Sequence, residues 1–211
     1  FATIMPKADV FVETIEKERN HVELTDVTAR FLGDVLGKIL FGLELKSLEE
    51  QDRTFPAIVE MIMKDVSFRK KTIVEMHSKF FNFFRLVGTN KNATNFLKEQ
   101  LLRNIEYRKN NPQVMNDVLE HMLSTELEFN DIFAHSSVMF VAGLDNLVST
   151  IKNCIYELSK SEELQTKARQ NVLDAMDKTK GELTYETLNE MQYIDQCING
   201  KSLISSFKPP S

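Results

Sequence analysis

Apolar residues recur at intervals of three and four along most of this chain, which is the spacing of one face of an α-helix. Short polar stretches with Gly, Asn or Pro separate the periodic segments and favour turns. The predicted helices run from an N-cap region at Thr25 and Asp26 to Gly42, over 52–87, from Asn95 to Asn110, and over 118–123, 130–159, 162–177 and 184–199, with a polar loop over 88–94 and a turn at Gly181. We therefore predict an all-α, mostly helical protein.

The longest periodic segment, residues 130–159, is expected to be the buried central helix of the domain, because it is both long and apolar. Its middle contains Gly143 and Asp145, and both residue types are costly there. A glycine inside a helix gives up about 1 kcal/mol relative to alanine. The position therefore suggests a flat group that packs against exposed backbone.

The composition is that of a globular protein, since 42% of the residues are hydrophobic and 27% are charged. The formal net charge of −5 argues against a nucleic-acid-binding protein, because such domains usually carry a basic stripe. The one dense basic cluster, at residues 69–71, is interpreted as a solvated helix face.

Cysteine and histidine spacing indicates no metal site. Cys154 and Cys197 lack CxxC spacing, so we expect two small buried residues in a reducing compartment. The four histidines show no His-x-x-x-His or similar spacing. A phosphate-binding glycine loop and a serine-centred elbow are also missing from the sequence.

The segment from Phe140 to Thr150, which reads FVAGLDNLVST, resembles the central helix of the cytochromes P450. That family has the pattern Ala/Gly-Gly-x-Asp/Glu-Thr, followed by small hydroxyl residues. Ala142, Gly143 and Asp145 match this pattern, whereas the threonine position holds an asparagine. Taken alone, the motif also fits a plain core helix with one satisfied aspartate.

Segments on both sides resemble the same family in the same order. They are residues 29–37 with 41–43, residues 105–110 with 116–119, residues 155–169 and residues 181–195. We therefore interpret residues 1–199 as a partial cytochrome P450 domain, the helical core portion of that fold truncated at both ends. In character it is most similar to the insect microsomal detoxifying group.

The resemblance implies a haem-thiolate monooxygenase, which inserts one oxygen atom from O2 into a hydrophobic small molecule with electrons from an NADPH-dependent reductase. Ala142 and Gly143 would face the haem, Asp145 and Asn146 would occupy the proton-relay position, and Phe140 would form part of the substrate pocket wall. Helical spacing also puts Gly143, Asn146 and Thr150 on one face.

Two departures from the family bear on activity. An amide at Asn146 cannot relay a proton as a hydroxyl does, although it can hold a water molecule by hydrogen bonds. The family's Glu-x-x-Arg motif is expected directly after Asn199, where this chain reads Gly-Lys-Ser-Leu, and the cysteine loop that ligates the haem iron is not found in the chain. We expect this stretch alone to be inactive. The alternative is a degenerate, non-catalytic helical protein that binds a ligand or a partner.

We predict no signal or membrane-spanning segment in the chain, which opens at Phe1, so an anchor would lie upstream. The resemblance implies a full-length protein on the cytosolic face of the endoplasmic reticulum membrane. Residues 80–84, Phe-Phe-Asn-Phe-Phe, fit equally a membrane-dipping hairpin and a buried core contact.

The resemblance stops abruptly after Asn199. Gly200, Lys201 and Ser202 can be encoded by a sequence that contains GTAAGT, a typical intron start. We therefore interpret residues 200–211 as a tail outside the family pattern, with translated intron as the hypothesis for its origin.

Overall fold

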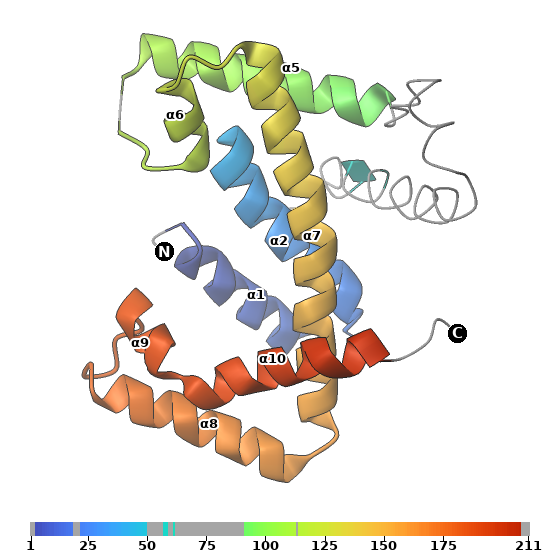
Figure 1. The fold of residues 1–211 in the computed structure, drawn as a ribbon, viewed down its shortest axis with the longest axis vertical. Coiled ribbons are helices and arrows are strands. Elements are labelled where there is room, and N and C mark those ends of the chain that lie inside the picture. The colour runs from blue at the N-terminus through green and yellow to red at the C-terminus, as the bar shows by residue number, and fades with distance from the viewer. Residues whose placement is uncertain are drawn as a thin grey trace. The chain divides into compact units, whose positions relative to one another are not determined.

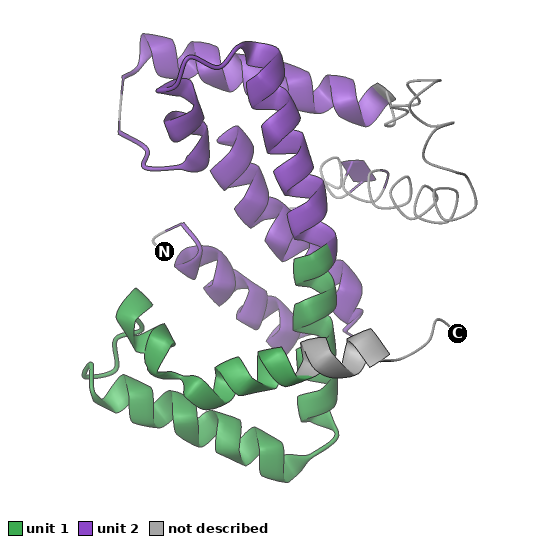
Figure 2. Ribbon diagram, viewed as in Figure 1, with its two compact units in different colours: residues 1–2, 146–211 green, residues 3–145 purple. Residues whose placement is uncertain are grey.

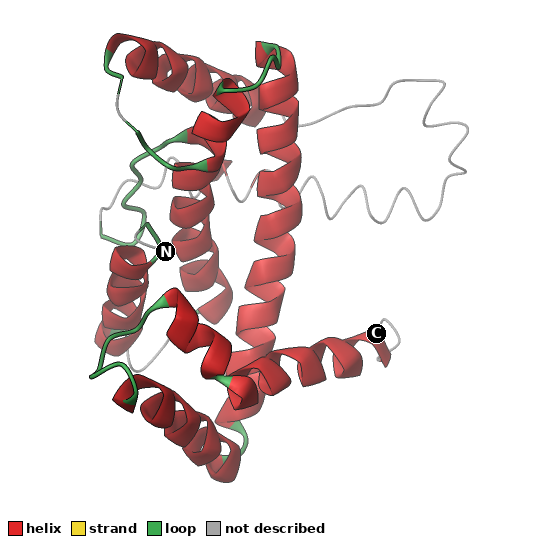
Figure 3. Cartoon of the chain, turned by 60° about the vertical axis from the view of Figure 1, so that its left-hand side comes forward, coloured by secondary structure: helices red, strands yellow, loops and turns green. Residues whose placement is uncertain are grey.

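The computed structural model describes residues 3–18, 22–49, 57–58, 61, 91–112 and 114–207. Within these ranges the regular structure is helical and contains no strand (Figure 3), so the predicted all-α class is confirmed. Figure 1 shows the helices α1 (Met5–Lys17), α2 (Leu24–Phe41), α5 (Lys91–Asn110), α6 (Val118–Leu123), α7 (Phe129–Ser159), α8 (Glu162–Asp177), α9 (Tyr185–Glu190) and α10 (Gln192–Phe207).

Most of the predicted helices have the bounds that the sequence indicates. The helices α6 and α8 agree with the prediction at both ends, and α7 begins one residue earlier than predicted. Gly42 ends α2 in the left-handed conformation, and Gly181 adopts positive φ in the predicted turn. Most of the predicted helix over 52–87, together with the basic cluster and the aromatic run within it, lies outside the described residues.

Three boundary predictions are wrong. Glu23 is the N-cap of α2, because its carboxylate accepts the Thr25 N–H at 3.1 Å, whereas Asp26 lies in the first turn. Residues 91–94 are helical rather than a loop, and burial of Ala93 in that turn favours the helix despite its polar neighbours. The predicted helix over 184–199 is two helices, since the chain turns at the buried Met191, and the second helix continues beyond residue 199 to Phe207.

The chain divides into two compact units, drawn in different colours in Figure 2. One unit contains residues 3–145, with α1, α2, α5, α6 and the first part of α7. The other contains residues 1–2 and 146–211, with the rest of α7 and α8, α9 and α10. The boundary between the two units therefore falls within α7.

In the unit of residues 3–145, the end of α2 packs on α7. The Phe41 and Phe140 rings meet edge to face with centroids 5.8 Å apart, and both residues are fully buried. The Ser136 hydroxyl donates to the Leu40 carbonyl at 3.1 Å, so α7 satisfies one of the carbonyl groups left over at the end of α2. This contact combines apolar burial with a cap supplied by another helix.

The same end of α2 is tied to α5. The Asn104 amide donates to the Gly42 carbonyl at 2.8 Å, and its oxygen accepts from the Arg108 Nε at 2.7 Å. Arg108 in turn donates to both carboxylate oxygens of Asp117, at 2.9 and 2.6 Å. Both side chains of this ion pair are largely buried, at 10% and 8% exposure.

Asp117 also begins α6, because its carboxylate accepts the Glu120 N–H at 2.8 Å as an N-cap. Burial by itself raises the pKa of Asp117, but the hydrogen bonds from Arg108 and from the Glu120 N–H, together with the Arg108 charge, outweigh it and lower the pKa below 3.8. The Asp117 carboxylate therefore joins the end of α5 to the start of α6, and its partners favour the charged form.

In the unit of residues 1–2 and 146–211, α8 packs through Ala168 and Ala175, which are buried. The Asn171 side-chain oxygen accepts the N–H groups of Tyr193 and Ile194, at 3.1 and 3.4 Å. These N–H groups belong to the first turn of α10, where backbone donors lack partners within the helix. A side chain of α8 therefore caps α10 from outside.

Replacement of Gly42 by alanine should strongly destabilise the unit of residues 3–145. A Cβ there would lie 2.6 Å from an Arg108 nitrogen and 2.7 Å from the Asn104 oxygen, and φ is +69°. We expect Gly42→Ala to lower the free energy of unfolding by about 3 kcal/mol or more, because backbone strain adds to a disturbed ion pair. Urea unfolding followed by circular dichroism measures it.

Gly181→Ala is the matched control, since φ is +87° there but no atom lies within 4 Å of the added Cβ. Backbone strain alone should lower the free energy of unfolding by about 1–2 kcal/mol. Equal losses in the two variants would show that the Asn104 and Arg108 contacts contribute nothing at Gly42.

The Arg108–Asp117 pair should make stability fall in acid. Because the folded state holds the Asp117 pKa below 3.8, its contribution is fully present above that value and is lost as the pH falls through the folded pKa. Asp117→Asn should cost about 3 kcal/mol at neutral pH and progressively less as the pH drops. Urea midpoints measured from neutral to strongly acid pH test this, and a constant difference between the two proteins would contradict it.

Candidate functional site

The candidate site lies in the middle of α7, whose buried residues recur every four positions. They are Ile132, Ser136, Phe140, Leu144 and Val148. This spacing defines one face of the helix and agrees with the predicted central helix. The other sequence-predicted site residues lie beside this buried face or opposite it.

Phe140 belongs to the buried face. Its side chain is fully buried and lies against Phe41 of α2, so it is a core residue of the unit of residues 3–145. The predicted role as a wall of a substrate pocket stays a prediction.

Ala142 and Gly143 form the small-residue part of the site. Ala142 is exposed and Gly143 is partly exposed. A Cβ added to Gly143 would meet only the Leu36 side chain, at 3.6 and 3.9 Å, which is ordinary van der Waals contact. Packing among the described residues therefore does not explain why a glycine stands here.

Asp145 is partly exposed and Asn146 is exposed, and they lie one and two residues after the buried Leu144. The Thr150 hydroxyl donates to the Asn146 backbone carbonyl at 2.8 Å. The structure therefore joins two of the three residues predicted to share a face, Asn146 and Thr150, through the backbone. Such a bond back to the preceding turn often bends a helix slightly.

Exposed apolar side chains adjoin the small residues on α7. Val138 is 67% exposed, Met139 47% and Leu147 41%. Together with Ala142 they give the accessible side of the helix an apolar surface, on which Asn146 supplies an amide. The arrangement can hold a flat or apolar group and offers it one hydrogen-bonding side chain.

The residues of this surface fit one flat face of a haem. The accessible Ala142 and the absent Cβ at Gly143 leave room for a flat ring against the backbone. Cys154 and Cys197 lie on the helices α7 and α10 rather than in a loop, and both are half-buried, so the prediction that they are buried is wrong. Across the described part of the chain, His, Cys, Asp and Glu form no group of three that could hold a metal ion.

Sequence reasoning missed two contacts at this site. It did not find Leu36 as the neighbour of Gly143, because no local pattern links residues of separate helices. It placed Asn146 and Thr150 on one face but did not predict their hydrogen bond. A threonine inside a helix often donates to the carbonyl four residues before it, so the sequence contained a usable signal.

One described helix, α7, is long and apolar enough to cross a membrane by length and composition alone. A core helix of a globular domain meets the same criteria, and the buried face of α7 against α2 is that of a core helix. This feature is therefore weak evidence for a membrane span.

A family model described as cytochrome P450 matches residues 1–199. Curated relatives include cytochrome P450 6j1 of Blattella germanica, 27% identical over 201 residues, which are 90% of this chain and 40% of that protein. The probable cytochrome P450 6a13 of Drosophila melanogaster is 24% identical over 207 residues, which are 94% of this chain and 42% of the relative. The chain thus spans well under half the length of these relatives.

Gly143→Ala should leave this chain folded and raise its free energy of unfolding by up to about 1 kcal/mol. Alanine is the better helix former, and the added methyl group meets only Leu36 at ordinary distance. Leu144→Ala is the control: its side chain is fully buried, so the loss should be about 2–5 kcal/mol. Urea unfolding measures both, and a large loss in Gly143→Ala would show that the glycine serves packing.

Proposed function

This chain belongs to the cytochrome P450 family, and we propose that it forms part of a haem-thiolate monooxygenase. The full-length enzyme would insert one oxygen atom from O2 into a hydrophobic small molecule, with electrons from an NADPH-dependent reductase. The observation that carries the proposal is the family match over residues 1–199. The accessible surface of α7, apolar with small residues and one amide, supports it.

In this proposal Ala142 and Gly143 contact the flat face of the haem. The Gly143 backbone allows that approach, because Leu36 is the nearest side chain that the described residues bring to an added Cβ. The haem, when bound, supplies the oxygen-activating chemistry. The exposed apolar residues Val138 and Met139 exclude water beside it. Phe140 supports the pocket wall from the core.

Asp145 and Asn146 would handle protons and water at the same site. An amide can donate and accept hydrogen bonds but does not exchange a proton at neutral pH as a hydroxyl does through its O–H. Asn146 would therefore hold a water molecule, and that water would carry the proton delivered from Asp145. Proton delivery through a held water is slower or less well directed than through a side chain in place.

The proposed location of the full-length protein is the cytosolic face of the endoplasmic reticulum membrane. Its family, with relatives in two insects, supports this placement. The partners would be the reductase, oxygen and the apolar substrate. The formal charge of −5 gives no support to nucleic acid as a partner.

A second candidate function is a non-catalytic helical protein that binds an apolar ligand or a partner. One observation favours it, namely the amide of Asn146 at the position where the family has threonine. The exposed apolar side of α7 would then bind the ligand without chemistry.

The reduced, carbon-monoxide difference spectrum tests the proposed function. The protein translated from the complete transcript should show the Soret band of thiolate-ligated haem. The 211-residue chain should not, because its two cysteines are half-buried on helices. If the complete protein gives no such band, the non-catalytic function is favoured. A band from the 211-residue chain would identify Cys154 or Cys197 as a ligand, which single Cys→Ser variants would assign.

We also propose that residues 200–211 are translated from an intron. The family match ends at residue 199, and the codons for Gly200, Lys201 and Ser202 can contain an intron start. Sequencing the mature transcript across the Asn199 codon should show a junction after which Glu-x-x-Arg and the cysteine loop follow. Mature message that encodes Gly-Lys-Ser and then a stop would contradict this origin.

A further inference from the structure

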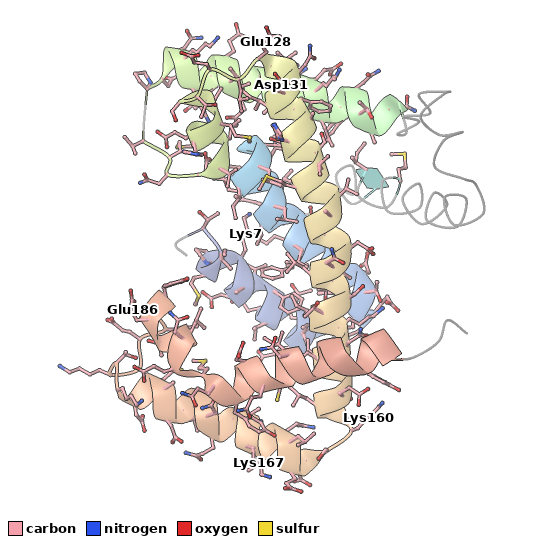
Figure 4. The ribbon with its side chains drawn as sticks, viewed as in Figure 1. Lys7, Glu128, Asp131, Lys160, Lys167 and Glu186 are labelled. Carbon is pink, nitrogen blue, oxygen red and sulfur yellow. The ribbon has the colours of Figure 1, made fainter. Side chains whose placement is uncertain are left out.

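Within the segment that follows α2, residues 45–47 are held by three side chains from two helices. Lys7 of α1, labelled in Figure 4, donates from Nζ to the Leu45 carbonyl at 2.8 Å. Asp34 of α2 accepts the Ser47 N–H at 2.8 Å, and Arg30 of α2 donates to the Ser47 carbonyl at 3.4 Å. Both backbone groups of Ser47 are therefore bound, and the residue is only 6% exposed.

Asp34 is the buried member of this group, at 3% exposure. One carboxylate oxygen binds Ser47, whereas the other is buried and has no hydrogen-bond partner among the described residues. Burial raises the pKa of Asp34, and the negative charge of Glu49 acts in the same direction, while Ser47 and Lys7 lower it. The Ser47 N–H therefore needs an acceptor oxygen at Asp34, and this bond favours the charged carboxylate whereas burial opposes it.

Lys46, next to Ser47 in the chain, is exposed where Ser47 and Asp34 are buried. Its side chain is exposed, but the peptide bond that follows it leads into the buried Ser47. A protease that recognises a basic side chain can therefore contact Lys46 in the folded protein. It cannot bind the Lys46–Ser47 bond in extended form unless residues 45–47 leave the surface of α1 and α2.

We propose that Lys7, Arg30 and Asp34 form a latch that keeps residues 45–47 closed and hides a cleavage site for trypsin-like proteases at Lys46–Ser47. Opening the latch is a local event. It breaks the three side-chain hydrogen bonds to residues 45 and 47 and the turn bond from the Glu49 N–H to the Lys46 carbonyl, and it does not require the Arg108–Asp117 pair to break. The cleavage rate at Lys46 then reports the population of the open latch. This inference stands independently of the proposed monooxygenase function.

The test is limited trypsin digestion of the full chain under native, single-hit conditions, with fragments counted by mass spectrometry. Cleavage after Lys46 reports the latch. Cleavage after Arg108, which is buried in its ion pair, reports unfolding of the same unit. Asp34→Ala should raise the ratio of the first rate to the second about tenfold or more, because it removes the acceptor for the Ser47 N–H.

Three further variants define the latch. Asp34→Asn keeps an acceptor oxygen without a charge, so its cleavage ratio should rise much less than that of Asp34→Ala. Lys7→Met removes the contact with Leu45 and should raise the ratio several-fold while α1 keeps its length and apolar stem. Asp9→Ala, at an exposed position of α1, is the control and should change nothing.

An unchanged ratio in Asp34→Ala or equal acceleration at both sites would overturn the latch. If Asp34→Ala does not fold, Lys7→Met decides the question in the same way. A ratio in Asp34→Asn as high as in Asp34→Ala would overturn the role of the acceptor oxygen.

Discussion

The contact on which the unit of residues 3–145 depends is the hydrogen-bonded chain from the Gly42 carbonyl through Asn104 and Arg108 to Asp117. It ties the end of α2, the end of α5 and the start of α6 with charges that are largely removed from water. A buried ion pair is stable only if its remaining polar atoms find partners, and here the N–H of Glu120 and the amide of Asn104 supply them. The absent side chain at Gly42 makes room for the arginine.

The two buried carboxylates of this unit show how surroundings decide charge. Asp117 accepts from a bidentate arginine and from a helix N-terminus, so its pKa is lowered despite burial. Asp34 accepts from one serine, and its other oxygen has no partner in the part of the chain that the structure describes, so burial prevails and raises its pKa. Asp117 therefore joins two helices, whereas Asp34 holds the loop at Ser47 with fewer hydrogen bonds.

The helix α7 joins the core of the protein to its candidate chemistry. Two of its buried residues contact the end of α2: Phe140 packs against Phe41, and Ser136 donates to the Leu40 carbonyl. The accessible residues alongside are small, apolar or amide-bearing, and Gly143 among them serves no packing contact that alanine would break. A position that costs helix stability without a packing reason is expected where a ligand, rather than the core, sets the requirement.

Helix type, most helix ends and the candidate site on α7 follow from the sequence, because they depend on local spacing. Apolar periodicity fixes which residues can share a face, and glycines at 42 and 181 supply the positive φ that their turns need. The sequence alone also carried the family resemblance.

Contacts between distant residues were decided only by the tertiary structure. Arg108 and Asp117 stood in segments that resemble the family, yet their pairing could not be predicted, and neither could the capping of α10 by Asn171. The division of residues 184–199 into two helices at the buried Met191 was likewise a tertiary effect. Burial and partner geometry determine these features, and neither is encoded in the spacing of residues along one segment.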